Sequence, residues 1–260
     1  MKVAVVGKGG VGKTFVAGTL ARLSKMAGET VIAIDADPST NLHFELGIDE
    51  DVVGSITPLC ENRLLVRERT GADYDSPYPV FNLSPAVADI VERYAIDSPD
   101  GVKLLIMGTV KNPGEGCMCP ANALLRALLR HVFVKLDATV VIDMEAGLEH
   151  LGRGTIEYVD SVLNILEPST RSIETSMKIW HLASKLGIRK HLFIANKVAR
   201  EDEEKFIEKS LAIDGHHLDL TIPYDENIKL LGMRHRAAVD SSKDSPALAA
   251  IEELRKKLYS

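Results

Sequence analysis

The residues best equipped for chemistry lie near the start of the chain, in the pattern Gly7-x-x-x-x-Gly12-Lys13-Thr14. An apolar run over Val3–Val6 predicts a short buried strand before them, and helical spacing of apolar residues begins at Lys13. Glycines at such a junction let backbone N–H groups turn toward phosphate oxygens, and the helix start adds positive field. Lys13 is placed to neutralise β- and γ-phosphates, and Thr14 to ligate Mg²⁺. The expected nucleotide contacts of this loop are Gly7, Gly9, Gly10, Val11, Gly12, Lys13 and Thr14.

Two later apolar runs end in aspartate, at Asp35 and at Asp143. Ligands collect where parallel strands end, so both carboxylates are expected beside the phosphate loop. Asp143 is typical of a Walker B strand, whose carboxylate reaches Mg²⁺ directly or through water. Asp35 is expected to support the magnesium shell through water, with an ordinary strand-end cap as the alternative. Gly147 is expected to bring its N–H against the γ-phosphate and so to sense hydrolysis.

Two cysteines one residue apart, Cys117 and Cys119, form a candidate metal site. Gly116 permits a tight turn, and Pro120 predicts the start of a helix whose N-terminus favours thiolate. Two thiolates do not complete a tetrahedral shell, whereas a twofold dimer supplies four. Soft thiolates suit Ni²⁺, Zn²⁺, Cu(I) or an iron–sulfur cluster. The pair predicts a metal shared between two copies of the chain, with buried, inert cysteines as the alternative.

Two segments in the second half of the chain are candidates for base recognition. Asn196 and Lys197 follow an expected strand, and an asparagine there can pair with adenine through its donor and its acceptor. Pro223 and Asp225 close another expected strand. Each motif is short, and a plain turn is the alternative. We expect Asn196 and Lys197 to contact the base.

The elements that position these residues alternate between apolar strands and amphipathic helices. This alternation predicts an α/β fold, a doubly wound and mostly parallel sheet with helices on both faces. Strands are expected at 3–6, 30–35, 101–108, 138–143, 161–166, 191–195 and 217–222. Helices are expected from Lys13, at 58–69, from Pro120, and at 171–186, 201–211 and 247–259. Residues 71–101 are the least regular, with room for a short hairpin. No repeat or linker divides residues 1–260, so one domain is expected.

Composition narrows the class of partner. The chain has 260 residues, 45% of them hydrophobic, and a formal net charge of −6, which does not favour nucleic acid. No apolar run is long enough to span a membrane, and no signal-peptide segment follows Met1, so no membrane partner is expected. Three cysteines do not make a disulfide framework. A cytoplasmic location is therefore expected.

Lys8, inside the loop, adds a charge that the phosphates bound by its own chain hardly need. The sequence Lys8-Gly-Gly-Val-Gly-Lys13-Thr14 resembles the deviant Walker A motif of the nitrogenase iron protein, septum-site, partition and arsenite-pump ATPases. The resemblance implies a homodimer in which Lys8 reaches the partner's nucleotide, as an arginine finger does, with an exposed loop lysine as the alternative. It also implies that Asp37, in a segment similar to switch I, orients the attacking water. The family often packs a segment like that of Pro223 and Asp225 around the base. Lys8, Lys13 and Asp37 are thus the expected catalytic residues.

Five segments together resemble the CooC-type maturation ATPases, which load nickel into carbon monoxide dehydrogenase or, in a close relative, serve acetyl-CoA synthase. The segments are Lys8–Thr14, Asp35–Pro38, Glu68–Gly71, Cys117–Pro120 and Asp143–His150. The resemblance implies an ATPase that uses ATP and Mg²⁺ and binds nickel, or zinc, at a Cys-x-Cys site across a homodimer. It leaves open which client enzyme receives the metal, and the roles of Glu145 and His150.

Two other functions are compatible with the sequence. One is an ATP-gated electron donor with a 4Fe–4S cluster, resembling the nitrogenase iron protein, although that protein takes its cysteines from separate loops. The other is a spatial organiser resembling the septum-site or partition ATPases, although the C-terminal segment has little apolar bulk for membrane insertion.

Overall fold

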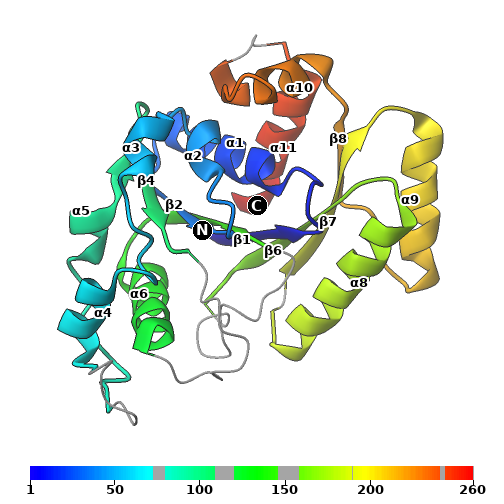
Figure 1. Ribbon diagram of the computed structural model, residues 1–260. Coiled ribbons are helices and arrows are strands. Elements are labelled where there is room, and N and C mark those ends of the chain that lie inside the picture. The colour runs from blue at the N-terminus through cyan, green and yellow to red at the C-terminus, as the bar shows by residue number, and fades with distance from the viewer. Residues whose placement is uncertain (73–79, 109–119, 146–157, 189, 241–243, 260) are drawn as a thin grey trace.

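The computed structural model describes residues 1–72, 80–108, 120–145, 158–188, 190–240 and 244–259. At its centre is an eight-stranded sheet with the strand order β3-β4-β2-β5-β1-β6-β7-β8 (Figure 1). Its strands are β1 (Lys2–Gly7), β2 (Val31–Ala36), β3 (Ile96–Asp97), β4 (Lys103–Ile106), β5 (Thr139–Met144), β6 (Ser161–Leu166), β7 (Lys190–Val198) and β8 (Leu220–Pro223). All neighbours pair in parallel except β3, which pairs antiparallel with β4. The expected α/β class is confirmed.

Helices cover both faces of the sheet (Figure 1). One face carries α1 (Lys13–Met26), α2 (Leu42–Glu45) and α11 (Pro246–Tyr259), which share an apolar cluster with Val3 and Val5. The other carries α4 (Arg63–Thr70), α5 (Ile90–Tyr94), α6 (Pro120–Lys135) and α8 (Thr170–Lys185), which pack with Ala4 and Val6. Alternate residues of a strand point to opposite faces, so β1 supplies both cores. The remaining helices are α3 (Glu50–Gly54), α9 (Glu201–Ile213), α10 (Glu226–Gly232) and the 3₁₀ turn η2 (Ala238–Asp240).

The register of the sheet brings the chemistry-bearing residues together. β5 lies between β2 and β1, with Asp143 opposite Asp35 on one side and opposite Val5 on the other. β6 lies on the far side of β1, with Ile165 opposite Gly7. The ends of β1, β2 and β5 therefore meet at one edge of the sheet, where α1 begins.

Several of the expected elements have different bounds in the structure, among them the strand expected at 217–222, which begins only at Leu220, and the strand expected at 191–195, which extends to Val198. The helix expected at 58–69 begins only at Arg63, because the backbone N–H groups of Leu59 and Cys60 donate to the end of β4 and its continuation. Asn62 then caps α4 by accepting from the Leu65 N–H at 3.0 Å. The strand expected at 101–108 is restricted to Lys103–Ile106. No helix among the described residues is long and apolar enough to cross a membrane.

Candidate nucleotide site

Close backbone contact explains the first glycine of the loop. Gly7 ends β1 with φ +149°, and a Cβ there would lie 2.3 Å from the Ile165 carbonyl oxygen on β6. The chain can therefore turn away from the sheet only with glycine at this position. The loop then leads directly into α1, whose first residue, Lys13, is buried. This places the start of a 14-residue helix at the carboxyl edge of the sheet, the arrangement that binds phosphates.

Two side chains from the end of β7 brace the loop from outside. The Asn196 amide nitrogen donates to the Val11 carbonyl at 2.8 Å, and Lys197 Nζ donates to the Gly10 carbonyl at 2.6 Å. Gly12, with φ +94°, leaves no room for a Cβ, which would lie 2.3 Å from the Asn196 amide nitrogen. Lys197 itself has φ +60°, a strained backbone for a side-chain-bearing residue. These contacts hold the loop open in one shape, so its donors need little reorganisation when phosphate binds.

The two strand-end aspartates are both buried but have different surroundings. Asp35 accepts hydrogen bonds from the N–H groups of Leu42 at 3.0 Å and Asp37 at 3.1 Å. Asp143 accepts no hydrogen bond of ordinary geometry from the described residues at either carboxylate oxygen. Burial raises the pKa of Asp143 to about 6, against the opposing influence of the Thr14 hydroxyl and Lys13. A buried carboxylate with free lone pairs, close to a hydroxyl, fits the Mg²⁺ of a nucleotide complex.

Asp35 is also costly to ionise in the absence of a cation. Burial raises its pKa to about 7, and the charges of Asp143 and Asp37 add to the effect, although the bonds from Leu42 and Asp37 oppose it. Its two hydrogen bonds hold the turn after β2 in place, so it caps the strand end. That is the alternative that the sequence left open, and it is compatible with a water-mediated role toward Mg²⁺.

The three expected catalytic residues lie around the loop. Lys13 Nζ is 3.9 Å from a carboxylate oxygen of Asp37. The other oxygen of Asp37 accepts from the Ser39 N–H at 2.9 Å and from the Ser39 hydroxyl. Lys8 Nζ lies 3.9 Å from Glu167, and its side chain is 38% exposed. An exposed lysine held by one long ion pair can leave it at little cost.

A pocket of about 400 Å³ adjoins the loop and gathers all four residues expected around the base. It also includes Phe15, Tyr224 and Ile228, which the sequence analysis did not assign to the site. The lining residues are Gly12, Phe15, Asn196, Lys197, Pro223, Tyr224, Asp225, Ile228, Lys229 and Ala247. Apolar and aromatic walls with a few polar groups suit a flat heterocycle. Phe15 directly follows the Lys13-Thr14 pair, and this position could have indicated that it lines the site. Ile228 belongs to α10, a helix that the sequence analysis did not predict.

Two residues that line this pocket, Asp225 and Asn196, also form hydrogen bonds within the protein. Asp225 caps α10 by accepting from Asn227 at 2.9 Å and Ile228, and it accepts from the Ser245 hydroxyl at 2.6 Å. The Asn196 side-chain oxygen accepts from the Lys197 N–H at 2.9 Å. Their roles toward a base remain predictions.

Cys117, Cys119 and Gly147 lie outside the described residues. Among the residues that are described, no three histidine, cysteine or acidic side chains converge as a metal site.

Strand, braced loop, buried lysine and paired strand-end carboxylates together define a P-loop nucleotide-binding protein and an ATPase. Comparison with known proteins agrees. Residues 2–239 match the model of the CobQ/CobB/MinD/ParA nucleotide-binding domain, and the chain belongs to that family.

Two relatives in sequence are informative. The chain is 45% identical over 229 residues to the carbon monoxide dehydrogenase accessory protein CooC of Rhodospirillum rubrum, which covers 88% of this chain and 86% of that protein. It is 42% identical over 233 residues to an uncharacterised ATP-binding protein of Methanocaldococcus jannaschii, with 88% and 87% covered. The resemblance to CooC-type proteins is confirmed.

Solved structures support the fold. The MinC:MinD cell division complex of Aquifex aeolicus matches with a TM-score of 0.70 and 20% identity, covering 100% of this chain and 96% of that one. A ParA-family ATPase from Chlorobium tepidum matches with a TM-score of 0.70 and 16% identity, covering 98% of each chain.

Proposed function

We propose that this chain is an accessory ATPase for the maturation of carbon monoxide dehydrogenase, or of acetyl-CoA synthase, that carries nickel to the client enzyme. The observation that carries the proposal is the combination of an ATPase site with a Cys-x-Cys pair at Cys117 and Cys119, in a chain 45% identical to CooC. Neither feature alone would indicate metal delivery. Zinc can occupy the same thiolates, because both ions accept soft ligands.

The nucleotide site acts through positioning and charge. Bound Mg²⁺ would supply a counter-charge for the phosphates, held by Thr14 and Asp143. Lys13, buried and 3.9 Å from Asp37, neutralises the β- and γ-phosphates. Asp37 orients the attacking water, with Ser39 fixing its carboxylate. Asp35 holds the turn on which Asp37 lies, and Gly147 senses the γ-phosphate by its N–H.

Two copies of the chain would share the nucleotide and the metal. Lys8 reaches across the twofold axis to the partner's triphosphate, and its exposure and long ion pair with Glu167 leave it free to do so. The same pairing brings four thiolates to one ion. Because the two events use one interface, nucleotide and metal must tighten each other's binding by the same factor. Hydrolysis then loosens the dimer and releases the metal. We propose one ATPase domain over residues 1–260 and a cytoplasmic site of action.

The test is a nickel titration of the wild-type protein with and without a non-hydrolysable ATP analogue. The expected stoichiometry is one metal per two chains, with tighter binding when nucleotide is present. Cys117→Ala/Cys119→Ala should lose this binding, whereas Cys60→Ala should keep it and serves as the thiol control. Unchanged metal binding in the double variant would refute the proposal.

The same preparation separates the other two functions. Purified without oxygen, a brown dimer with about four irons would indicate the electron-transfer alternative. Co-sedimentation with liposomes or DNA in the presence of ATP would indicate the spatial organiser. We expect neither result. A spatial organiser would have no use for the cysteine pair. The nitrogenase iron protein takes its cysteines from separate loops, whereas Cys117 and Cys119 are one residue apart.

A further inference from the structure

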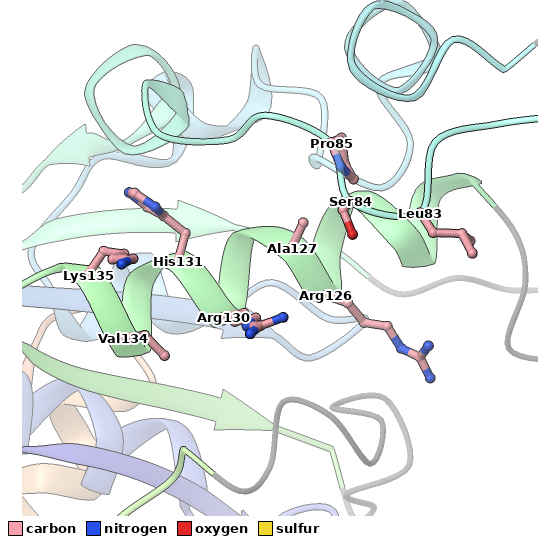
Figure 2. A pocket seen from close by; sticks show the side chains of 9 residues that line it. All are labelled: Leu83, Ser84, Pro85, Arg126, Ala127, Arg130, His131, Val134 and Lys135. Carbon is pink, nitrogen blue, oxygen red and sulfur yellow. The ribbon is translucent and has the colours of Figure 1, made fainter.

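A second hollow, of about 450 Å³, lies away from the nucleotide pocket along helix α6. One side is formed by Leu83, Ser84 and Pro85, which run beside the helix (Figure 2). The floor and the other side come from α6 and comprise Arg126, Ala127, Arg130, His131, Val134 and Lys135. We call this hollow the α6 groove. Nothing in the nucleotide mechanism uses it.

The α6 groove is strongly cationic in a chain whose net charge is −6. Arg126 and Arg130 extend from successive turns of the helix, and Lys135 follows at its end (Figure 2). No acidic side chain is found among the described residues that line the groove, and α6 contains none. None of the three cations forms an ion pair with the described residues. Asp89, in the segment after residues 83–85, is already used by Arg69 at 2.7 Å and Arg93 at 3.1 Å.

This charge arrangement is not explained by the stability of α6. A cation in the last turn, such as Lys135, interacts favourably with the helix dipole. Arg126 and Arg130 lie in the middle of the helix at i and i+4, where like charges repel. An acidic residue beside them would relieve the repulsion, and the part of the chain that the structure describes places none in the groove. An external anion would supply this compensation.

The shape indicates what kind of anion fits. Arg126 to Lys135 spans nine residues, or about 14 Å along the helix axis, which is several times the size of one phosphate. Apolar side chains lie beside the cations, with Leu83 57% exposed and Val134 48% exposed. Alternating charge and apolar contact over this length matches about four residues of extended peptide. A long polyanion such as nucleic acid would meet the net negative charge of the rest of the chain.

We propose that the α6 groove docks a short segment of acidic and apolar residues on the protein that receives the metal. The inference rests on the proposed function and adds to it the surface that recognises the partner. Pro120, the first residue of α6, directly follows Cys119 in the sequence. Arg126 is six residues further on, about 9 Å along the helix. A partner held in the groove is therefore held near the start of the helix that follows the thiol pair.

The first experiment tests the chemistry of the groove alone. The probe is a fluorescent seven-residue peptide of alternating glutamate and leucine, compared with its lysine–leucine counterpart. Arg126→Glu/Arg130→Glu should weaken binding of the acidic peptide by about tenfold or more, and salt should weaken wild-type binding. Arg126→Gln/Arg130→Gln should give an intermediate loss. Equal affinity of wild type and charge-reversed protein, or equal binding of the lysine peptide, would overturn the proposal.

A matched control uses two lysines with the same spacing on another helix. Lys205→Glu/Lys209→Glu on α9 changes the net charge by the same amount on an exposed surface and should leave peptide binding unchanged. Both double variants should keep their ATP hydrolysis and thermal unfolding midpoint, which shows that they are folded. A control that loses binding as much as the α6 variant would show a nonspecific charge effect and would also overturn the proposal.

The second experiment replaces the peptide by metal-free carbon monoxide dehydrogenase of the same organism. If wild type binds it and the α6 charge reversal abolishes binding, both inferences are supported. If wild type and the α6 charge-reversed protein bind it equally, the groove assignment is wrong while the proposed function stands. If wild type binds the acidic peptide through the groove but neither binds the enzyme nor delivers nickel to it, the proposed function has failed instead.

Discussion

Replacing Asp143 by asparagine should stabilise the protein without nucleotide and remove its response to Mg²⁺ and ATP. The carboxylate is buried, has no hydrogen-bond partner of ordinary geometry among the described residues, and has a pKa raised by burial from its ordinary value of 3.8 to about 6. A carboxylate whose pKa is raised by folding stabilises the native state at low pH. That stability is lost as pH rises through about 6, because the folded state holds the proton longer than the unfolded chain does.

The size of the effect follows from the shift. Raising a pKa from 3.8 to about 6 corresponds to about 3 kcal/mol of unfolding free energy lost between pH 4 and pH 7. Asparagine has the same shape and no charge, so it avoids this cost but gives up the attraction of Lys13. Removal of the charge also makes Asp35 easier to ionise, because the charge of Asp143 raises the pKa of Asp35. We therefore expect Asp143→Asn to be about 1 to 3 kcal/mol more stable than wild type at pH 7.5.

Urea denaturation at pH 5 and pH 7.5, with and without Mg²⁺ and an ATP analogue, measures this. Without ligand, the variant should exceed wild type at pH 7.5, and its advantage should be about half as large at pH 5, because about half of the wild-type loss has already occurred at that pH. With ligand, wild type should gain stability according to ligand concentration over Kd, and the variant should gain little. Asp137→Asn, at an exposed position, is the control and should behave as wild type. A variant less stable than wild type under every condition would refute the reasoning.

Three further predictions follow from single positions. Burial raises the pKa of Glu45 to about 7, so ionisation of this side chain destabilises the fold at high pH. Glu45→Gln should therefore raise the free energy of unfolding by about 2 kcal/mol at pH 8.5 and by much less at pH 5 in the same denaturation assay. An equal gain at both pH values would contradict this. Gly12→Ala should cost more than about 2 kcal/mol, since its Cβ meets Asn196, whereas Gly9→Ala, with no atom within 4 Å, should be nearly neutral in thermal melts. Lys8→Ala should lower the rate of ATP hydrolysis by at least about tenfold with little change in nucleotide affinity by titration, and an unchanged rate would remove the trans role.

The fold could be predicted from the sequence largely because strand and helix periods differ and the chain alternates between them. The central strands are mostly apolar, as buried parallel strands are, and β2 and β5 carry Asp35 and Asp143 near their carboxyl ends, where ligands bind. The failures are local. The segment before α4 has the composition of a helix but donates its N–H groups to the end of β4, a tertiary contact invisible to periodicity. The short helices α2, α3 and α10 have too few turns to show a pattern.

The parts of the candidate site that depend on residue type could be predicted from the sequence. The parts that depend on how the strands pack against one another could not. The loop, Lys13, Asp35 and Asp143 follow from motif and strand ends. The bracing of the loop by Asn196 and Lys197 could not be predicted, because it depends on how far β7 extends beyond β6 and on the irregular pairing with β8 between Ala195 and Val198. That irregularity turns the chain so that both side chains reach the loop.

The site extends across most of the sheet, and this has a consequence for how nucleotide affects the protein. Asp35 lies at the end of β2, Asp143 on β5, the loop after β1, the side chains that contact the loop on β7, and the pocket beside the loop at β8. The charge of Asp143 opposes ionisation of Asp35, and Lys197 has a strained backbone, so unfavourable interactions lie at more than one strand end. Magnesium nucleotide would relieve the repulsion at one side and fill the pocket at the other. Binding of the nucleotide should therefore stabilise the sheet from β2 to β8 rather than one loop. Hydrolysis should change the interactions at every strand end that contacts the nucleotide.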